Sequence, residues 1–206
     1  MEPFRRVEGA AAPLDRPNVD TDQIIPKQFL KRIERSGYGP FLFYDWRYAC
    51  DGTTENPDFE LNRTEYRGAP VLLAGRNFGC GSSREHAVWA LEDYGVRAVV
   101  APSFSDIFSA NALKVGLLPV RLPEAVVARW IDAAKEEPGI TAVVDLEAGV
   151  VSMAGETHPI EIDPEARRRL LGGLDEIALA LTHDGEISDF ERRRPAWLPA
   201  AGIPTG

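Results

Sequence analysis

The residues best suited to chemistry lie in one short glycine-rich segment, residues 75–86, which reads GRNFGCGSSREH. An apolar run precedes the segment and a helical pattern follows it, which predicts a turn between a strand and a helix. Glycines let the backbone approach a ligand closely, and the first N–H groups of a helix attract anions. Arg84, expected at the second or third helical position, adds a planar fork that fits a carboxylate. The segment therefore predicts a site for a small carboxylic acid.

This segment differs from the two common phosphate-binding loops. A dinucleotide-binding loop requires a third glycine where residues 79–84 place an arginine, and a P-loop requires Gly-Lys followed by serine or threonine. Neither pattern is present, so the segment favours a carboxylate over a nucleotide.

Several of these residues also have a structural interpretation. Ser82 and Glu85 fit the Ser-x-x-Glu capping box, in which each side chain bonds the backbone N–H of the other. We expect His86 to be a hydrogen-bonding interior residue rather than a general base. Cys80 is typical of a small packing residue, although a helix start would lower the pKa of its thiol. Ser82 is thus either a cap or a reactive group.

Asp20 and Asp22, on either side of Thr21, form a second candidate group. Such a pair is typical of a turn or cap, and it could also bind a metal or orient an arginine. Cys50 and Cys80 are the only two cysteines, too few for the four-cysteine shell of an iron–sulfur cluster or a structural zinc. Most ligands of any metal would have to lie elsewhere.

Length and charge narrow the class of protein. With 206 residues, 44% of them apolar, we expect a single domain of residues 1–206, with a core at about 1–182 and a C-terminal extension at about 183–206. The formal net charge of −9 argues against nucleic-acid binding. No apolar run approaches the roughly 20 residues that span a bilayer, and the first residues lack the apolar core of a signal peptide. We therefore expect a cytoplasmic protein with no membrane or nucleic-acid partner.

The elements around the glycine-rich segment follow a βαβ pattern. Apolar runs at residues 70–74, 97–101 and 117–122 predict three parallel strands. The helical patterns between them end at Gly95 and Gly116, which suit the left-handed residue after a helix. The first helix should therefore carry the end of the glycine-rich segment at its start.

Residues 1–69 are rich in proline, glycine and aromatic side chains. Within them, residues 19–26 predict a turn into a short strand that Pro26 ends. Residues 27–39 form a candidate loop, which we expect to be mobile and functional and to contain a helical turn.

The segments after residue 122 predict a smaller, antiparallel part. Pro123 opens an amphipathic helix, and residues 140–146 and 150–153 predict a hairpin. Residues 158–162 are a possible third strand, and Asp163 opens a helix that the glycines at 172 and 173 interrupt. We expect a mixed α/β fold.

Two stretches of this sequence closely resemble the small subunits of bacterial 3-isopropylmalate dehydratases. They are NVDTDQIIP at residues 18–26 and FGCGSSREHA at residues 78–87, and the resemblance extends to residues 39–48, 106–111 and 173–177. Those subunits are similar to the swivelling β/β/α domain at the C-terminus of aconitase, which closes over a [4Fe-4S] cluster carried by the other part of the enzyme. The resemblance implies an α/β swivel domain with an N-terminal entry, no metal in this chain, and a large cluster-binding subunit as partner in a heterodimer or higher hetero-oligomer.

The resemblance also implies a reaction and its residues. It implies interconversion of 2-isopropylmalate and 3-isopropylmalate by dehydration and rehydration, in leucine biosynthesis, by an enzyme active only with the large subunit. Ser82 would be the base, Ser83 and Arg84 would hold a substrate carboxylate, and Asp22 would have an orienting role.

Other site residues are expected in the loop that follows. One aconitase arginine has no evident counterpart, and Lys27 and Lys31 are the candidates to replace it. Phe29, Leu30 and Ile33 are candidates for the isopropyl pocket, where burial of such a group contributes about 1.5–3 kcal/mol.

Two alternatives remain open at this point. The chain could be the small subunit of a sibling hydro-lyase that acts on citraconate, dimethylmaleate or homoaconitate. It could also be a non-catalytic carboxylate-binding module in which Ser82 only caps a helix.

Overall fold

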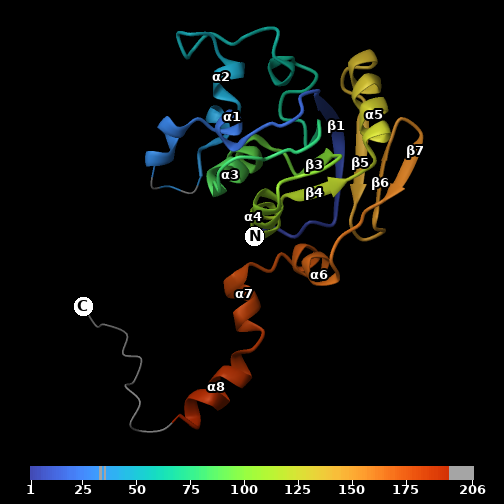
Figure 1. Cartoon of the computed structure of the whole chain (residues 1–206). Coiled ribbons are helices and arrows are strands. Elements are labelled where there is room, and N and C mark those ends of the chain that lie inside the picture. Colours follow the sequence, from blue (N-terminus) through green and yellow to red (C-terminus); the bar gives the residue numbers. More distant parts are fainter. Residues whose placement is uncertain (33, 35, 195–206) are drawn as a thin grey trace.

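The computed structural model describes residues 1–32, 34 and 36–194, and it is built around one sheet (Figure 1). Its strand order is β4-β3-β2-β1-β5-β6-β7. The strands are β1 (Arg6–Leu14), β2 (Val71–Ala74), β3 (Ala98–Ala101), β4 (Leu118–Arg121), β5 (Thr141–Asp145), β6 (Val150–Met153) and β7 (Glu156–Pro159).

Helices cover the sheet and extend the chain beyond it. The α-helices are α1 (Thr21–Ile24), α2 (Tyr44–Arg47), α3 (Glu85–Tyr94), α4 (Asp106–Val115), α5 (Glu124–Glu136), α6 (Pro164–Gly172), α7 (Glu176–Leu181) and α8 (Asp184–Arg192). Short 3-10 helices lie at Lys27–Lys31, Gly39–Phe41 and Glu60–Asn62.

Strand β1 divides the sheet into two halves. Its residues 11–14 pair in parallel with β2, and β3 and β4 continue in the same direction; β1 to β4 are the parallel half. Its residues 6–10 pair antiparallel with β5, and β5 to β7 form the antiparallel half. The expected parallel strands are confirmed as β2, β3 and β4, and β1 adds a fourth. The expected third strand of the antiparallel part lies earlier, at Glu156–Pro159.

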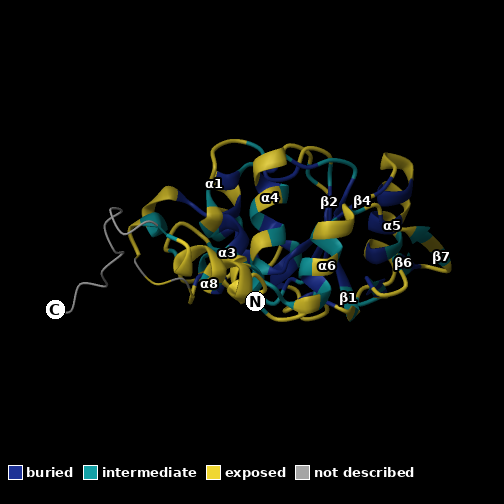
Figure 2. Ribbon diagram, turned by 90° about the horizontal axis from the view of Figure 1, so that it is seen from below, coloured by how far each residue is buried: buried dark blue, intermediate teal, exposed yellow. Residues whose placement is uncertain are grey.

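Two apolar layers cover the two faces of the sheet. On one face, α3 and α4 pack against side chains such as Leu72 and Val99, together with aromatic side chains from residues 38–66. On the other face, α5 places the fully buried Trp130 against alternate strand residues such as Leu73 and Val100. The alternation arises because successive strand side chains point to opposite faces. Figure 2 shows the buried residues between the helices and the sheet.

The ends of the two crossover helices follow the sequence prediction. Gly95 and Gly116 adopt φ of +110° and +100°, the left-handed conformation that glycine adopts without a steric penalty. Residues 95–97 then connect the end of α3 to the start of β3.

The prediction of a strand within residues 19–26 is wrong. Residues Thr21–Ile24 form α1, and Asp20 caps it: the carboxylate of Asp20 accepts from Gln23 N, and the side chain of Gln23 accepts from Asp20 N. This reciprocal capping box offsets the strand preference of the isoleucines, which are buried all the same. The expected helical turn in the loop that follows is confirmed at Lys27–Lys31.

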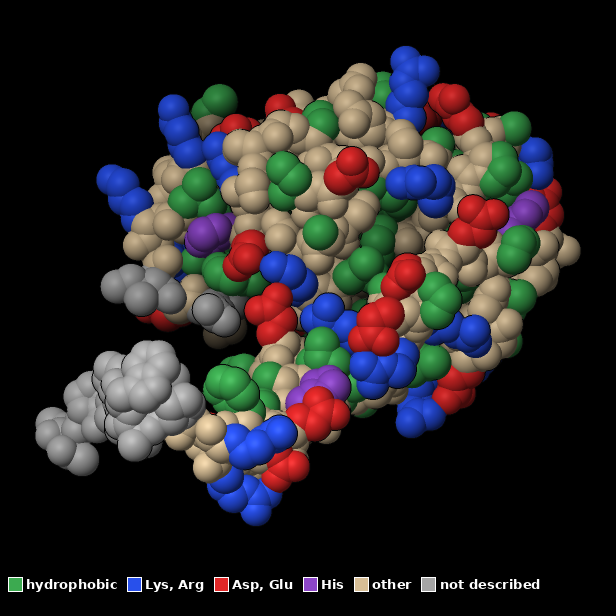
Figure 3. All heavy atoms as spheres, turned by 60° about the horizontal axis from the view of Figure 1, so that its bottom comes forward, with side chains coloured by type: hydrophobic (Ala, Val, Ile, Leu, Met, Phe, Trp, Pro, Cys, Tyr) green, Lys and Arg blue, Asp and Glu red, His purple; other side chains and the backbone are tan. Residues whose placement is uncertain are grey.

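The C-terminal helices extend away from the sheet (Figure 1). On the face in Figure 3, basic and acidic side chains are interspersed. Ion pairs at the surface include Arg168–Glu165 (2.7 Å) and Lys114–Glu176 (3.4 Å). Helices α7 and α8 expose apolar side chains, with Ile177 74% and Phe190 67% exposed. Across the described ranges, no helix combines the length and apolar character needed to cross a bilayer.

Candidate active site

The glycine-rich segment meets the segment that follows β1 at one edge of the parallel half. Because β1 and β2 are parallel neighbours, the chain leaves both at the same edge. Backbone hydrogen bonds join the two segments: Gly79 N donates to Val19 O (2.8 Å), and Thr21 N donates to Cys80 O (2.9 Å). Two parts of the chain about 60 residues apart thus form one structural unit.

The loop after β3 supports this unit from the other side. The backbone N–H of Phe78 donates to Ser103 O (3.0 Å), and that of Asn77 donates to the Ser103 hydroxyl (2.8 Å). Gly79 has φ of +73°, and a Cβ added there would lie 2.3 Å from the ring of Phe108. Glycine is required here because α4 packs directly against the loop backbone.

Ser82 and Ser83 lie exposed just before α3. Helix α3 begins at Glu85, its N-cap is Arg84, and no side chain caps it by a hydrogen bond. The capping box predicted for Ser82 and Glu85 is therefore wrong, as is a position for Arg84 inside the helix. The physical reason is local: the backbone of Arg84 is extended, with φ of −131° and ψ of 103°, so the helix cannot begin before Glu85.

The carboxylate of Asp22 holds Arg84 in place. Arg84 Nη1 donates to Asp22 Oδ1 and lies 3.5 Å from the backbone oxygen of Ile25. The arginine side chain is 16% exposed and the aspartate 55% exposed, so the guanidinium lies between the two loops and the carboxylate faces water. Of the roles open to the acidic pair, Asp20 therefore caps a helix and Asp22 orients an arginine.

Thr21, which the sequence did not indicate as a site residue, contacts Ser82 directly. Its side chain is 3% exposed, and its hydroxyl donates to Ser82 O at 2.9 Å. The same hydroxyl lies 3.5 Å from Ser82 Oγ. A helical interpretation of residues 20–25 would have revealed it, because Thr21, Ile24 and Ile25 then share one buried face.

The remaining predicted residues lie on or near the 3-10 helix Lys27–Lys31. Lys27 is exposed, and Leu30 packs half-buried against the core. The ring of Phe29 stacks on Phe41 at 4.2 Å and meets Tyr44 edge-on at 4.8 Å. The residue expected beside them, Ile33, lies outside the described residues. Their role toward a substrate stays a prediction.

Neither Cys80 nor His86 has the character of a reactive group. Burial, together with the nearby carboxylate of Asp20, raises the pKa of the Cys80 thiol, contrary to the expected lowering. Burial lowers the pKa of His86, whose ring lies 5.4 Å from that of Tyr38 and 4.7 Å from that of Trp89. His86 is thus a largely neutral ring packed against two aromatic side chains at pH 7.

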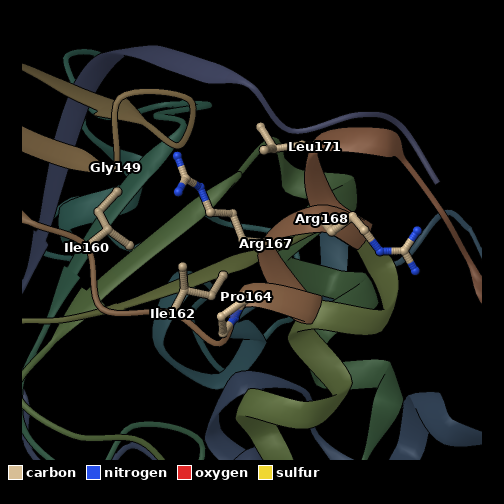
Figure 4. A pocket seen from close by; sticks show the side chains of 7 residues that line it. All are labelled: Gly149, Ile160, Ile162, Pro164, Arg167, Arg168 and Leu171. Atoms are coloured by element: carbon tan, nitrogen blue, oxygen red, sulfur yellow. The ribbon is translucent and has the colours of Figure 1, made fainter.

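A hollow elsewhere on the surface contains none of these residues. It lies between the antiparallel half and α6, with Ile160 and Leu171 in its wall (Figure 4). Arg167 also lines it, but donates to Leu146 O (3.1 Å) and Glu147 O (2.8 Å), which ties the guanidinium to the fold. Within the described part of the chain, no cluster of three or more His, Cys, Asp or Glu could hold a metal ion.

Comparison with known proteins finds close relatives along nearly the whole chain. The Aconitase C-terminal domain family matches residues 1–125. The 3-isopropylmalate dehydratase small subunit of Bacillus licheniformis is 55% identical over 203 residues, which cover 97% of this chain and 100% of that protein. The corresponding subunit of Bacillus subtilis is 51% identical over 205 residues, with coverage of 97% and 100%.

A solved structure has a similar architecture. The crystal structure of 3-isopropylmalate dehydratase from Methanocaldococcus jannaschii is 28% identical and superimposes with a TM-score of 0.63. The match covers 89% of this chain and 98% of that one. The expected swivel-type α/β fold is confirmed by this similarity and by the family match.

Proposed function

The chain belongs to the family of 3-isopropylmalate dehydratase small subunits, and from this membership we propose that it supplies one side of the active site of a hydro-lyase. The reaction interconverts 2-isopropylmalate and 3-isopropylmalate by dehydration and rehydration, as a step of leucine biosynthesis in the cytoplasm. The observation that carries the proposal is the pair of exposed serines beside an arginine that Asp22 orients. A serine that only caps a helix does not require an oriented arginine beside it.

Ser82 is the proposed base. The residue is exposed, and its side chain makes no capping hydrogen bond to α3. As an alkoxide, Ser82 takes a proton from the carbon beside a substrate carboxylate while hydroxide leaves the neighbouring carbon. On rehydration hydroxide adds to the carbon that lost the proton, and Ser82 returns a proton to the carbon that lost hydroxide, so that the two steps together balance as an isomerisation. The positive end of the α3 dipole and the guanidinium of Arg84 favour negative charge at this position.

Arg84 and Ser83 are proposed to hold a substrate carboxylate. Among the described residues, Arg84 contacts Asp22 and Ile25 through Nη1, so the guanidinium has further donors for a ligand. Asp22 fixes the direction of the fork, which reduces the entropy lost on binding. Lys27, Phe29 and Leu30 are proposed to contact the rest of the substrate, with Phe29 and Leu30 beside its isopropyl group.

The cluster and the second half of the site are proposed to belong to a large subunit. Two cysteines cannot supply the ligands of a [4Fe-4S] cluster, and Cys80 lies with its sulfur 3.4 Å from the backbone oxygen of Asn18. On the large subunit, such a cluster provides a Lewis acid for the substrate hydroxyl. The assembled enzyme is then a heterodimer or a higher hetero-oligomer.

The proposed function is tested by assembling the chain with its large subunit and assaying single substrates. We expect turnover of 2-isopropylmalate by the assembled enzyme, no turnover by either chain alone, and a higher kcat/KM for isopropylmalate than for citraconate, dimethylmaleate and homoaconitate. Turnover by this chain alone would contradict the proposal. A higher kcat/KM for one of the other acids would instead identify the chain as the small subunit of a sibling hydro-lyase.

A further inference from the structure

Thr21 is a buried polar residue directly behind the proposed base. It lies at the start of α1 between two aspartates that are already engaged, Asp20 with the helix cap and Asp22 with Arg84. Polar side chains are rarely buried without a hydrogen-bonding partner. The partner of Thr21 is on the other loop, 61 residues away in the chain.

The hydroxyl of Thr21 has one proton and two possible acceptors on Ser82. It donates that proton to the backbone oxygen of Ser82 at 2.9 Å, and it lies 3.5 Å from Ser82 Oγ. While the proton is on the backbone oxygen, Thr21 can only accept from a neutral Ser82 hydroxyl. If Ser82 Oγ becomes negatively charged, rotation about the Cβ–Oγ1 bond of Thr21 redirects the proton to it.

We propose that Thr21 is a positioning residue for the dehydratase reaction: it holds Ser82 in register while Ser82 is neutral and donates a hydrogen bond to Ser82 Oγ when that oxygen is charged. The inference rests on the proposed role of Ser82 as the base. Hydrogen bonds to a charged oxygen are about twice as strong as neutral ones, and a buried donor keeps its orientation without competing water. Thr21 therefore stabilises the alkoxide from the protein side while the substrate approaches from the solvent side.

The neighbouring charges make a neutral donor useful at this position. Arg84 follows Ser82 by two residues, and part of its charge is offset by Asp22. The carboxylate of Asp20 lies on the adjacent residue and opposes negative charge. A hydroxyl that donates only when Ser82 Oγ is charged stabilises the alkoxide. It adds no positive charge that could pair with Asp20 or hold the substrate in an unproductive position.

The test compares three variants of the assembled enzyme: Thr21→Val, which keeps the shape and removes the hydroxyl, Thr21→Ser, which keeps the hydroxyl, and Thr141→Val at an exposed position of β5. For Thr21→Val we expect kcat to fall about 10- to 100-fold, as for loss of a hydrogen bond to a charged group, with KM within about threefold. With substrate deuterated at the carbon that loses its proton, the isotope effect on kcat should increase. Thr21→Ser and Thr141→Val should keep kcat within about threefold.

The outcomes separate this inference from the proposed function. If Ser82→Ala lowers kcat by a factor of at least about 10² and Thr21→Val does not lower it, or if Thr21→Ser loses as much as Thr21→Val, the role of Thr21 is overturned and that of Ser82 stands. If Ser82→Ala retains turnover, the base assignment itself fails. In a Ser82→Ala background, Thr21→Val should have no further effect on kcat. Should Thr21→Val not fold, Thr21→Ala undergoes the same measurements.

Discussion

The two halves of the sheet are joined through one strand, yet they carry different kinds of residue at their edges. In the parallel half, the segments after β1, β2 and β3 meet and present Ser82 and Ser83 toward solvent, beside the largely buried side chain of Arg84. In the antiparallel half, short turns join β5 to β6 and β6 to β7, and Arg167 of α6 donates to the backbone oxygens of Leu146 and Glu147 at the first of these turns. Parallel strands need crossovers whose loops gather at one edge, whereas hairpin turns alternate between edges.

The comparison predicts that the halves respond differently to substitution. Changes at the loop edge of the parallel half should lower turnover and leave stability nearly unchanged. Changes in the antiparallel half should lower stability and leave the turnover of folded enzyme nearly unchanged.

Leu146→Ala should give the largest effect, on stability. Leu146 follows β5, is fully buried, and packs in the layer that contains Trp130. Truncation of a buried leucine costs about 2–5 kcal/mol of unfolding free energy. Denaturant unfolding of the chain measures the loss, and kcat of assembled, folded enzyme should stay within about twofold. A loss of kcat in Leu146→Ala without a loss of unfolding free energy would contradict the different roles of the two halves.

Ser82→Ala should give the largest effect on turnover. Removal of a positioned base should lower kcat of the assembled enzyme by a factor of at least about 10². Because Ser82 caps no helix, the unfolding midpoint of the Ser82→Ala variant should match that of the unchanged chain. Ser152→Ala, on β6, is the matched control and should keep kcat. Destabilisation by about 0.5–2 kcal/mol with retained kcat would restore the capping interpretation.

Arg84→Lys tests the carboxylate contact with a smaller expected effect. Lysine keeps the charge and loses the planar fork that Asp22 orients. We expect apparent substrate affinity to weaken by about 1–3 kcal/mol, read from KM with the large subunit and intact cluster in excess, and a smaller change in kcat. If KM and kcat of the variant are unchanged, Arg84 does not bind the substrate carboxylate.

Glu156→Gln should give the smallest effect, and only on stability in acid. Hydrogen bonds from Arg129 and His158 lower the pKa of Glu156 from 4.5 to about 2. A carboxyl with a lowered folded-state pKa contributes stability above its unfolded pKa and loses it as the pH falls toward the folded one. The variant should therefore differ from the unchanged chain at pH 7 and approach it between pH 4.5 and about 2. The pH dependence of thermal unfolding measures this, while kcat at pH 7 should be equal. A stability difference that grows in acid would show that Glu156 is not the cause.

Local sequence patterns predicted much of this molecule correctly. The parallel strands β2 to β4, the helix stops at Gly95 and Gly116, and the hairpin of β5 and β6 follow from periodicity and turn residues. The errors are also local. Residues 19–26 have strand-like isoleucines, but the capping box at Asp20 starts a helix instead. Ser82 fits a cap pattern, but the extended backbone of Arg84 makes Arg84 the N-cap.

The site residues of the glycine-rich segment and the βαβ frame around them could be predicted from local sequence, because glycine spacing and apolar periodicity act over a few residues. The contacts of Asp22 with Arg84 and of Thr21 with Ser82 could not, because they span 62 and 61 residues of chain and depend on how the strands pair. These contacts exist because β1 pairs in parallel with β2 and brings their following loops to one edge. Such a pairing is a property of the packed sheet, and no local pattern in either loop encodes the distance between them.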